Sequence, residues 1–107
     1  MINAIKALAA LAQETRLTIF RTLVQAGEPG VSAGELARTL GIPNATLSFH
    51  LKELVHAELI IARQESRFIY YSAHFTHMNA LIAYLTENCC AGTPCLPAAV
   101  CCDDNNS

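Results

Sequence analysis

The first 88 residues of this 107-residue chain contain no cysteine, although five cysteines follow between positions 89 and 102. The chain is also poor in charge, since Asp, Glu, Lys and Arg make up 15% of its residues, against about 25% in an average soluble domain. Its length indicates one domain. A chain so small with so few charged residues is expected to bury apolar surface against a partner, most simply a second copy of itself. The composition therefore predicts a homodimer.

Long apolar runs are missing too. No stretch of about 18 apolar residues is present, so no membrane span is expected. The N-terminal sequence MINAIKALAALAQ has no basic start and no clear cleavage site, so no secretory signal is expected. We therefore expect a cytoplasmic protein, in which thiols stay reduced. Clustered cysteines there indicate metal binding, redox activity or catalysis, and an odd count of five argues against complete internal pairing.

Apolar residues recur at helical spacing in the first half of the chain. The segments are residues 2–12 and 15–26, and the Gly and Pro of AGEPG end the second. Ser32 lies three residues before Glu35, a capping box that predicts a short helix through Leu40. After the turn GIP, a further helix starts at Asn44. The predicted apolar faces consist of Ile2, Ile5, Leu8 and Ala12, then Leu17, Phe20, Leu23 and Val24, and then Leu47, Leu51, Leu54 and Val55.

The second half begins with a strand pattern. LIIAR and RFIYYS are rich in β-branched and aromatic residues and are separated by QES, which predicts a two-stranded hairpin with a polar tip. A last helix is expected over about 74–87. Its apolar stripe consists of Phe75, Met78, Leu81, Ile82 and Leu85. The pattern stops after Asn88, and the tail that follows cannot build a core by itself.

The predicted order of elements is α-α-α-α-β-β-α, a mainly α chain with a two-stranded β-wing. A helix–turn–helix followed by such a wing is the winged-helix arrangement. Its second helix can enter a DNA major groove, and the wing can reach the neighbouring backbone. We expect a winged helix–turn–helix domain for DNA binding and dimerisation at residues 1–88 and a cysteine-rich tail at 89–107.

A nucleic-acid interface has to be argued from individual residues, because the net charge of -2 gives no overall basic signature. Amide and hydroxyl groups can bond base edges, and cations can reach phosphate. The predicted DNA-contacting residues are Asn44, Thr46, Ser48, Phe49, His50, Lys52, Arg63 and Arg67. The alternative is that they are ordinary surface residues, since segment 33–72 holds as many Glu as Lys and Arg.

Three segments carry a resemblance to a known family. ALAQETRLTIFRTLV, ELARTLGIPNATLSFHLKELVHAELI and ARQESRFIYYS resemble the ArsR/SmtB family of metal-responsive repressors. The resemblance implies a winged-helix homodimer that binds operator DNA and releases it when an inducer binds. It also implies a dimer interface on the first and last helices, near Ile5, Leu8, Leu81, Ile82 and Leu85. The chain departs from the family at Phe49, where His or Arg is common, and at Glu65-Ser66, where a wing Gly is common.

Members of this family bind their inducers at different sites, and each site can be compared with the residues of this sequence. The segment VSAGELARTL has no cysteine, so the family's Cys-x-Cys site on the third helix is absent. A zinc or nickel site on the last helix would need more carboxylate or His partners than His74, His77 and Glu87 supply. We interpret these His residues as capping or surface residues.

The remaining candidate site is the cysteine tail. Trivalent arsenic takes three sulfurs in a pyramid, and soft ions favour thiolate ligands. NCC followed by a further cysteine resembles the arsenite site of repressors with C-terminal cysteines. Carried over, the resemblance implies that Cys89, Cys90 and Cys95 bind As(III) or Sb(III) as inducer, with Cys101 or Cys102 as alternates for the third ligand. It implies no constitutive cofactor.

Other functions of the tail stay open. The cysteines could sense oxidation through a disulfide such as Cys90–Cys95, because a bridge between the neighbouring Cys89 and Cys90 would be strained. Four thiolates could instead hold Zn²⁺ or Cd²⁺. The tail could also be a disordered end with incidental cysteines. An enzyme is the least supported class, because no Cys-x-x-Cys lies beside a βαβ pattern.

Overall fold

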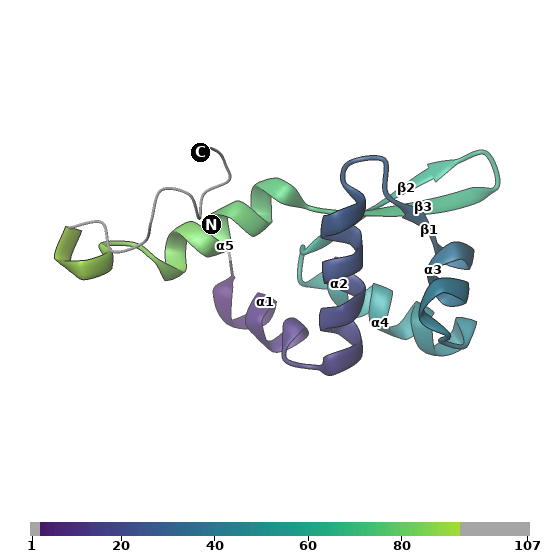
Figure 1. The fold of residues 1–107 in the computed structure, drawn as a ribbon, viewed down its shortest axis with the longest axis horizontal. Coiled ribbons are helices and arrows are strands. Elements are labelled where there is room, and N and C mark those ends of the chain that lie inside the picture. The colour runs from purple at the N-terminus through teal and green to yellow at the C-terminus, as the bar shows by residue number, and fades with distance from the viewer. Residues whose placement is uncertain (1–2, 93–107) are drawn as a thin grey trace.

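The computed structural model describes residues 3–92 of the chain. The predicted order of helices and strands is confirmed, with one added strand (Figure 1). The elements are α1 (Ala4–Leu11), α2 (Glu14–Ala26), β1 (Val31–Ser32), α3 (Ala33–Leu40), α4 (Asn44–His56), β2 (Ile60–Glu65), β3 (Phe68–Ala73), α5 (Phe75–Leu85) and the 3₁₀ helix η1 (Cys89–Gly92). The chain is therefore mainly α with a small antiparallel β-wing.

The wing contains a third strand that the sequence pattern did not reveal. β1 pairs with β3 in the strand order β1-β3-β2, and Val31 lies opposite Tyr71. A two-residue strand is too short to show an alternating pattern. Gly30 permits this pairing, because it has a φ of +77° and a Cβ there would lie 2.4 Å from the Tyr71 carbonyl oxygen.

The tip of the wing also differs from the prediction. We expected QES to form the tip, but Gln64 and Glu65 continue β2 and pair with Ile69 and Phe68. The turn consists of Ser66 and Arg67, and Ser66 has a φ of +62°. Backbone pairing therefore extends the strand past the point where apolar residues end.

Local hydrogen bonds explain where the helices begin. Ser32 Oγ accepts from the Glu35 amide at 3.3 Å, which confirms the predicted cap of α3. Gln13 caps α2 in the same way by accepting from the Arg16 amide at 2.8 Å. Gly41 ends α3 in the left-handed conformation that leads into the turn before α4.

The core lies between α2, α3, α4 and the inner ends of the wing strands. Its most deeply buried large side chains are Ile19, Leu23, Leu36, Leu47, Leu54, Leu59 and Ile60. Two of the predicted apolar faces are only partly covered within the chain. In α1 the buried residues are Ala7 and Ala10, whereas Ile5 is 78% exposed, and in α2 Leu17 is 42% exposed. Helical spacing identifies an apolar face but not the surface that covers it.

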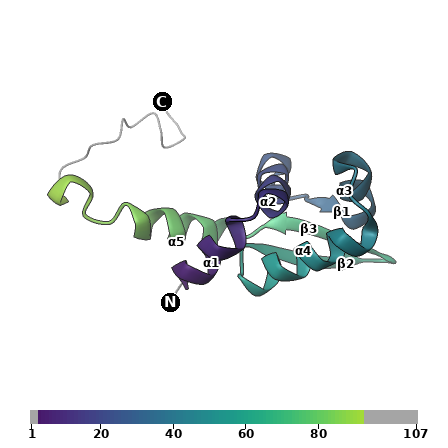
Figure 2. The same ribbon diagram turned by 90° about the horizontal axis from the view of Figure 1, so that it is seen from below.

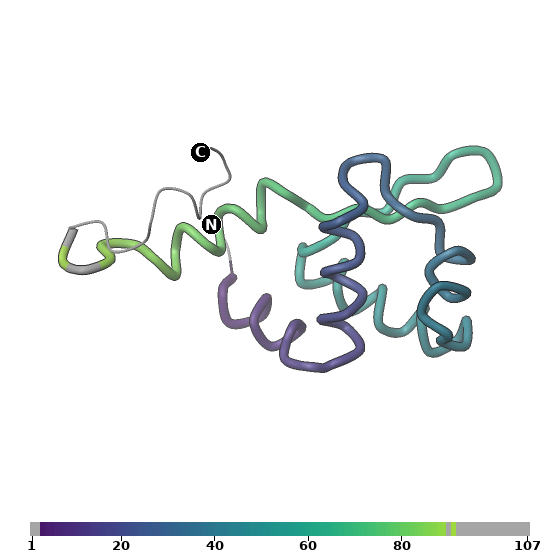
Figure 3. Tube along the Cα trace, in the orientation of Figure 1, coloured from purple at the N-terminus to yellow at the C-terminus, as the bar shows by residue number. Residues whose placement is uncertain are grey.

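The last helix leaves the body of the molecule. α5 runs beside α1, and its C-terminal half and η1 project away from the other elements (Figures 1, 2 and 3). The radius of gyration is 15.4 Å, against about 13 Å for a compact domain of 100 residues. No helix within residues 3–92 is long and apolar enough to cross a membrane.

Candidate nucleic-acid interface and sensor elements

α4 presents a polar side opposite its buried side. Leu47, Leu51 and Leu54 pack in the core. Five of the predicted DNA-contacting residues stay exposed on this helix, as do Ala45 and His56: the five are Asn44, Thr46, Ser48, Phe49 and Lys52. The helix starts after Pro43 without a side-chain cap. Its first amide groups are therefore available to an anion such as a DNA phosphate.

His50 lies elsewhere than predicted. We placed it on the DNA-facing side, but the structure leaves only 9% of it exposed. It follows Leu47 by three residues and precedes Leu54 by four, so it shares the buried face of α4. His50 is therefore not a direct DNA contact in this arrangement.

The buried imidazole of His50 meets a guanidinium. Arg16 Nη1 lies 3.3 Å from His50 Nδ1, and Arg16 Nε donates to the Ala10 carbonyl oxygen at 2.8 Å. Guanidinium is only a donor, so Nδ1 accepts and the ring proton sits on Nε2. Burial lowers the pKa of His50 below its ordinary value of 6.5, the charge of Arg16 lowers it further, and Glu53 acts in the opposite direction. The arrangement therefore requires neutral His50.

Sequence reasoning missed the role of Arg16. A signal was available, because Arg16 has helical spacing with the buried Ile19, Phe20 and Leu23. A charged residue on a buried helix face needs a partner. The sequence could not identify that partner, since it lies 34 residues away on another helix.

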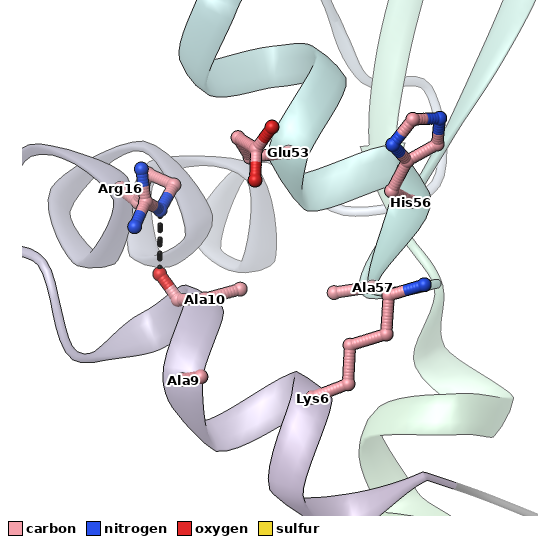
Figure 4. Close-up of a pocket in the computed structure, with 7 residues that line it drawn as sticks. All are labelled: Lys6, Ala9, Ala10, Arg16, Glu53, His56 and Ala57. Atoms are coloured by element: carbon pink, nitrogen blue, oxygen red, sulfur yellow. Dashed lines mark hydrogen bonds between the residues drawn. The ribbon is translucent and has the colours of Figure 1, made fainter.

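Arg16 also borders a cavity of about 230 Å³ between α1, α2 and α4 (Figure 4). Small side chains of α1 face this cavity, and Figure 4 shows Arg16 donating to Ala10 across one side of it. The lining residues are Lys6, Ala9, Ala10, Arg16, Glu53, His56 and Ala57. Beside this cavity, Arg16 links the Ala10 carbonyl of α1 to His50 of α4.

The two wing arginines have different surroundings. Arg63 Nε donates to Glu65 Oε2 at 2.8 Å, its Nη2 donates to the Pro29 carbonyl oxygen at 3.0 Å, and it lies over the Tyr70 ring. Arg67 is exposed in the turn, and no hydrogen bond or ion pair joins it to another residue within 3–92. Arg67 is therefore the wing cation more available to a phosphate.

The predicted sensor residues fall partly outside residues 3–92. Cys89, which is half-buried, and Cys90 lie in η1 just after α5. Cys95, Cys101 and Cys102 lie outside the described residues. Among the described residues no group of three or more His, Cys, Asp or Glu could hold a metal ion.

Of the two His residues at the start of α5, His74 confirms the capping interpretation, whereas the His77 side chain is no cap and is only 18% exposed. His74 Nδ1 accepts from the His77 amide at 3.2 Å, so His74 is the N-cap of the helix. His77 Nε2 lies 4.0 Å from Glu58 Oε1. His74 therefore uses a ring nitrogen for helix capping.

The fold and the exposed side of α4 define a winged helix–turn–helix protein. A family model described as a helix-turn-helix domain matches residues 11–62. The HTH-type transcriptional regulator YgaV of Escherichia coli is 36% identical over 83 residues, which cover 78% of this chain and 82% of YgaV. The chain belongs to the ArsR-type family of winged helix–turn–helix transcriptional regulators.

Solved structures agree with this membership. An ArsR-like transcriptional regulator from Rhodococcus sp. RHA1 has a TM-score of 0.71 and 29% identity, covering 83% of this chain and 80% of its own. The homodimeric winged helix-turn-helix DNA-binding domain of a possible ArsR-family regulator from Mycobacterium bovis has a TM-score of 0.61 and 25% identity, with coverages of 86% and 85%. These proteins share the fold across most of their length.

Proposed function

We propose that this protein is an arsenite- or antimonite-responsive repressor of an arsenic-resistance operon. It binds operator DNA as a homodimer in the cytoplasm and releases it when trivalent arsenic binds its C-terminal cysteines. The observation that carries the proposal is the succession of three features along the chain: an exposed polar α4, an uncovered apolar α5 and a cysteine cluster directly behind it. Residues 1–88 form the DNA-binding and dimerisation domain, and residues 89–107 form the inducer-binding tail.

The DNA contacts come from α4 and the wing. Five residues of α4 face the major groove, and Arg67 binds the phosphate backbone beside the groove. The five are Asn44, Thr46, Ser48, Phe49 and Lys52. His50 takes no direct part, and Arg63 contributes through its remaining donors. The exposed start of α4 adds amide groups toward a phosphate.

Dimerisation is supported by an apolar surface that α1 and α5 leave uncovered. We call it the α1/α5 face, and its members are Ile5, Leu8, Ile82, Tyr84 and Leu85, which are between 40% and 78% exposed. Burial of such side chains is favourable by roughly 25 cal/mol per Å². Leu81 was also expected at this interface, but it is already buried within its own chain. The homodimeric Mycobacterium bovis domain supports the same assembly.

Inducer capture exchanges oxygen for sulfur on arsenic. Arsenite loses three hydroxyl groups as water while three thiols lose their protons, and three arsenic–sulfur bonds form without any change of oxidation state. Cys89, Cys90 and Cys95 supply the thiols, with Cys101 or Cys102 as alternates for the third. No constitutive cofactor is required.

Release follows from coupling between the tail and α4. α5 packs on α1, and α1 contacts α4 and binds Arg16 through the Ala10 carbonyl. Arsenic bound by the cysteines beside α5 shifts α1 and thereby the spacing of the two α4 helices, which must fit successive major grooves about 34 Å apart. Arsenite releases DNA to the extent that it binds the shifted state more tightly.

The test is fluorescence anisotropy of the reduced protein on the DNA upstream of its own gene. We expect arsenite and antimonite to release the DNA and zinc, cadmium and peroxide to leave it bound. Cys89→Ser and Cys90→Ser should each abolish release, and release that survives both would show that the inducer site lies elsewhere. The third ligand is identified by comparing Cys95→Ser with the double variant Cys101→Ser/Cys102→Ser, because only the variant that removes that ligand abolishes release. Release by peroxide alone would assign the cysteines to oxidation sensing, and release by zinc or cadmium alone would assign them to a thiolate metal site.

A further inference from the structure

Phe49 is a large apolar side chain on the polar side of α4. Its side chain is 56% exposed, whereas the leucines of the same helix are buried. It follows Thr46 by three residues and precedes Lys52 by three, so the three side chains form one row on the helix surface. Thr46 and Lys52 are also exposed. Phe49 therefore lies within the surface that the proposed function turns toward DNA.

The ring of Phe49 is held by a chain of contacts that leads into the core. It stands edge-on to the His50 ring, with 5.4 Å between centroids and 63° between planes. His50 is fixed in turn by Arg16, which is bound to the Ala10 carbonyl oxygen. A ring with such support loses little conformational freedom when it is covered by a ligand. This chain of contacts distinguishes Phe49 from a surface residue that merely tolerates an aromatic side chain.

The major groove offers one apolar group to such a ring. Phenylalanine neither donates nor accepts hydrogen bonds, so it cannot read the polar edges of guanine, cytosine or adenine. The C5-methyl group of thymine is the apolar feature of the groove. We infer that Phe49 reads a thymine methyl group in each operator half-site and that His50 is a positioning residue for the Phe49 ring.

The inference rests on operator binding by the dimer, as proposed above, and adds a specificity determinant to it. His50 acts without touching DNA, because its ring is buried and its Nδ1 is occupied by Arg16. The contribution of one methyl group is modest. Burial of one such carbon is worth about fourfold in affinity per half-site.

The experiment replaces thymines of the operator one at a time with deoxyuridine, which lacks only the methyl group. Wild-type protein should lose about fourfold in affinity at one thymine of each half-site and little at the others. Phe49→Ala should bind more weakly overall and bind the thymine and deoxyuridine operators equally at that position. Loss of discrimination in Phe49→Ala identifies the ring as the group that recognises the methyl.

His50 is tested by the same ratio of affinities. His50→Leu should reduce the preference for thymine over deoxyuridine, and His50→Gln, which keeps an acceptor for Arg16, should restore part of it. If His50→Leu fails to fold, Phe49→Ala still tests whether Phe49 recognises the methyl group. His50→Gln then tests whether His50 positions the Phe49 ring. Equal affinity of wild-type protein for every deoxyuridine operator, or an unchanged penalty in Phe49→Ala, would overturn the inference. Failure of wild-type protein to bind any operator would instead refute the proposed function.

Discussion

Arg16 Nη1 lies 3.3 Å from His50 Nδ1, although the two residues are 34 positions apart and belong to α2 and α4. The same guanidinium binds the Ala10 carbonyl at the end of α1. One side chain thus joins the helix that begins the α1/α5 face to the helix with the proposed DNA-contacting residues. If α1 shifts as proposed above, we expect Arg16 to transmit that shift to α4.

The first prediction concerns pH. Burial and Arg16 lower the pKa of His50 below 6.5, so below about pH 6.5 the unfolded chain binds a proton that the folded chain excludes. The free energy of unfolding should therefore fall as pH decreases from 6.5 toward the lower pKa of the folded state. Urea unfolding of the wild type and of His50→Gln, carried out from about pH 5 to about pH 7.5, measures this change in the free energy of unfolding. The range spans the ordinary pKa of His, which is about 6.5. A difference between the two proteins that does not change with pH would contradict the assignment.

The second prediction concerns assembly through the α1/α5 face. Ile82→Glu should convert the proposed dimer to a monomer, because it places a charge in the apolar interface that we propose. Ile61→Glu is the matched control, since Ile61 is 50% exposed on the wing and Ile82 is 52% exposed on α5. Analytical ultracentrifugation should detect dissociation for Ile82→Glu alone. Dimers of unchanged stability in Ile82→Glu would place the interface elsewhere.

The third prediction compares two glycines. Gly30→Ala should destabilise the fold by about 2 kcal/mol or more, because a residue with a Cβ is strained at positive φ and meets the Tyr71 backbone. Gly34→Ala, inside α3, should be neutral or stabilising by up to about 1 kcal/mol, since a Cβ there meets only the end of Arg38 at 3.8 Å. Thermal unfolding followed by circular dichroism measures both. Equal stabilities would show that β1 does not need the backbone conformation of Gly30.

The fourth prediction concerns the wing. Arg67→Ala should weaken DNA binding on all sequences and reduce the slope of log affinity against log salt by about 1 for each phosphate that Arg67 neutralises. Arg63→Ala should reduce that slope less, because Glu65 already pairs with Arg63 at 2.8 Å. Salt titrations of both variants on the same operator test this order. A larger decrease in slope for Arg63→Ala would make Arg63 the main phosphate-binding residue of the wing.

Much of the fold could be predicted from local patterns. The cap at Ser32, the breakers around Pro29 and the apolar spacing of Leu47, Leu51 and Leu54 act over a few residues, so the order of helices and strands is visible in the chain. The exposed polar residues of α4 follow from the same spacing. The two-residue β1 escaped prediction because its pairing with Tyr70 and Tyr71 joins distant segments.

The sequence by itself determined the winged-helix order of elements, the polar side of α4 and the concentration of cysteines after residue 88. These properties depend on hydrogen bonds and side-chain periodicity within a few turns of backbone. Tertiary structure alone decided that His50 points inward, that Arg16 is its partner and that Ile5, Ile82 and Leu85 stay uncovered while Leu81 is buried. Those outcomes depend on which surfaces of separate helices meet, and periodicity reveals a face without revealing what packs against it.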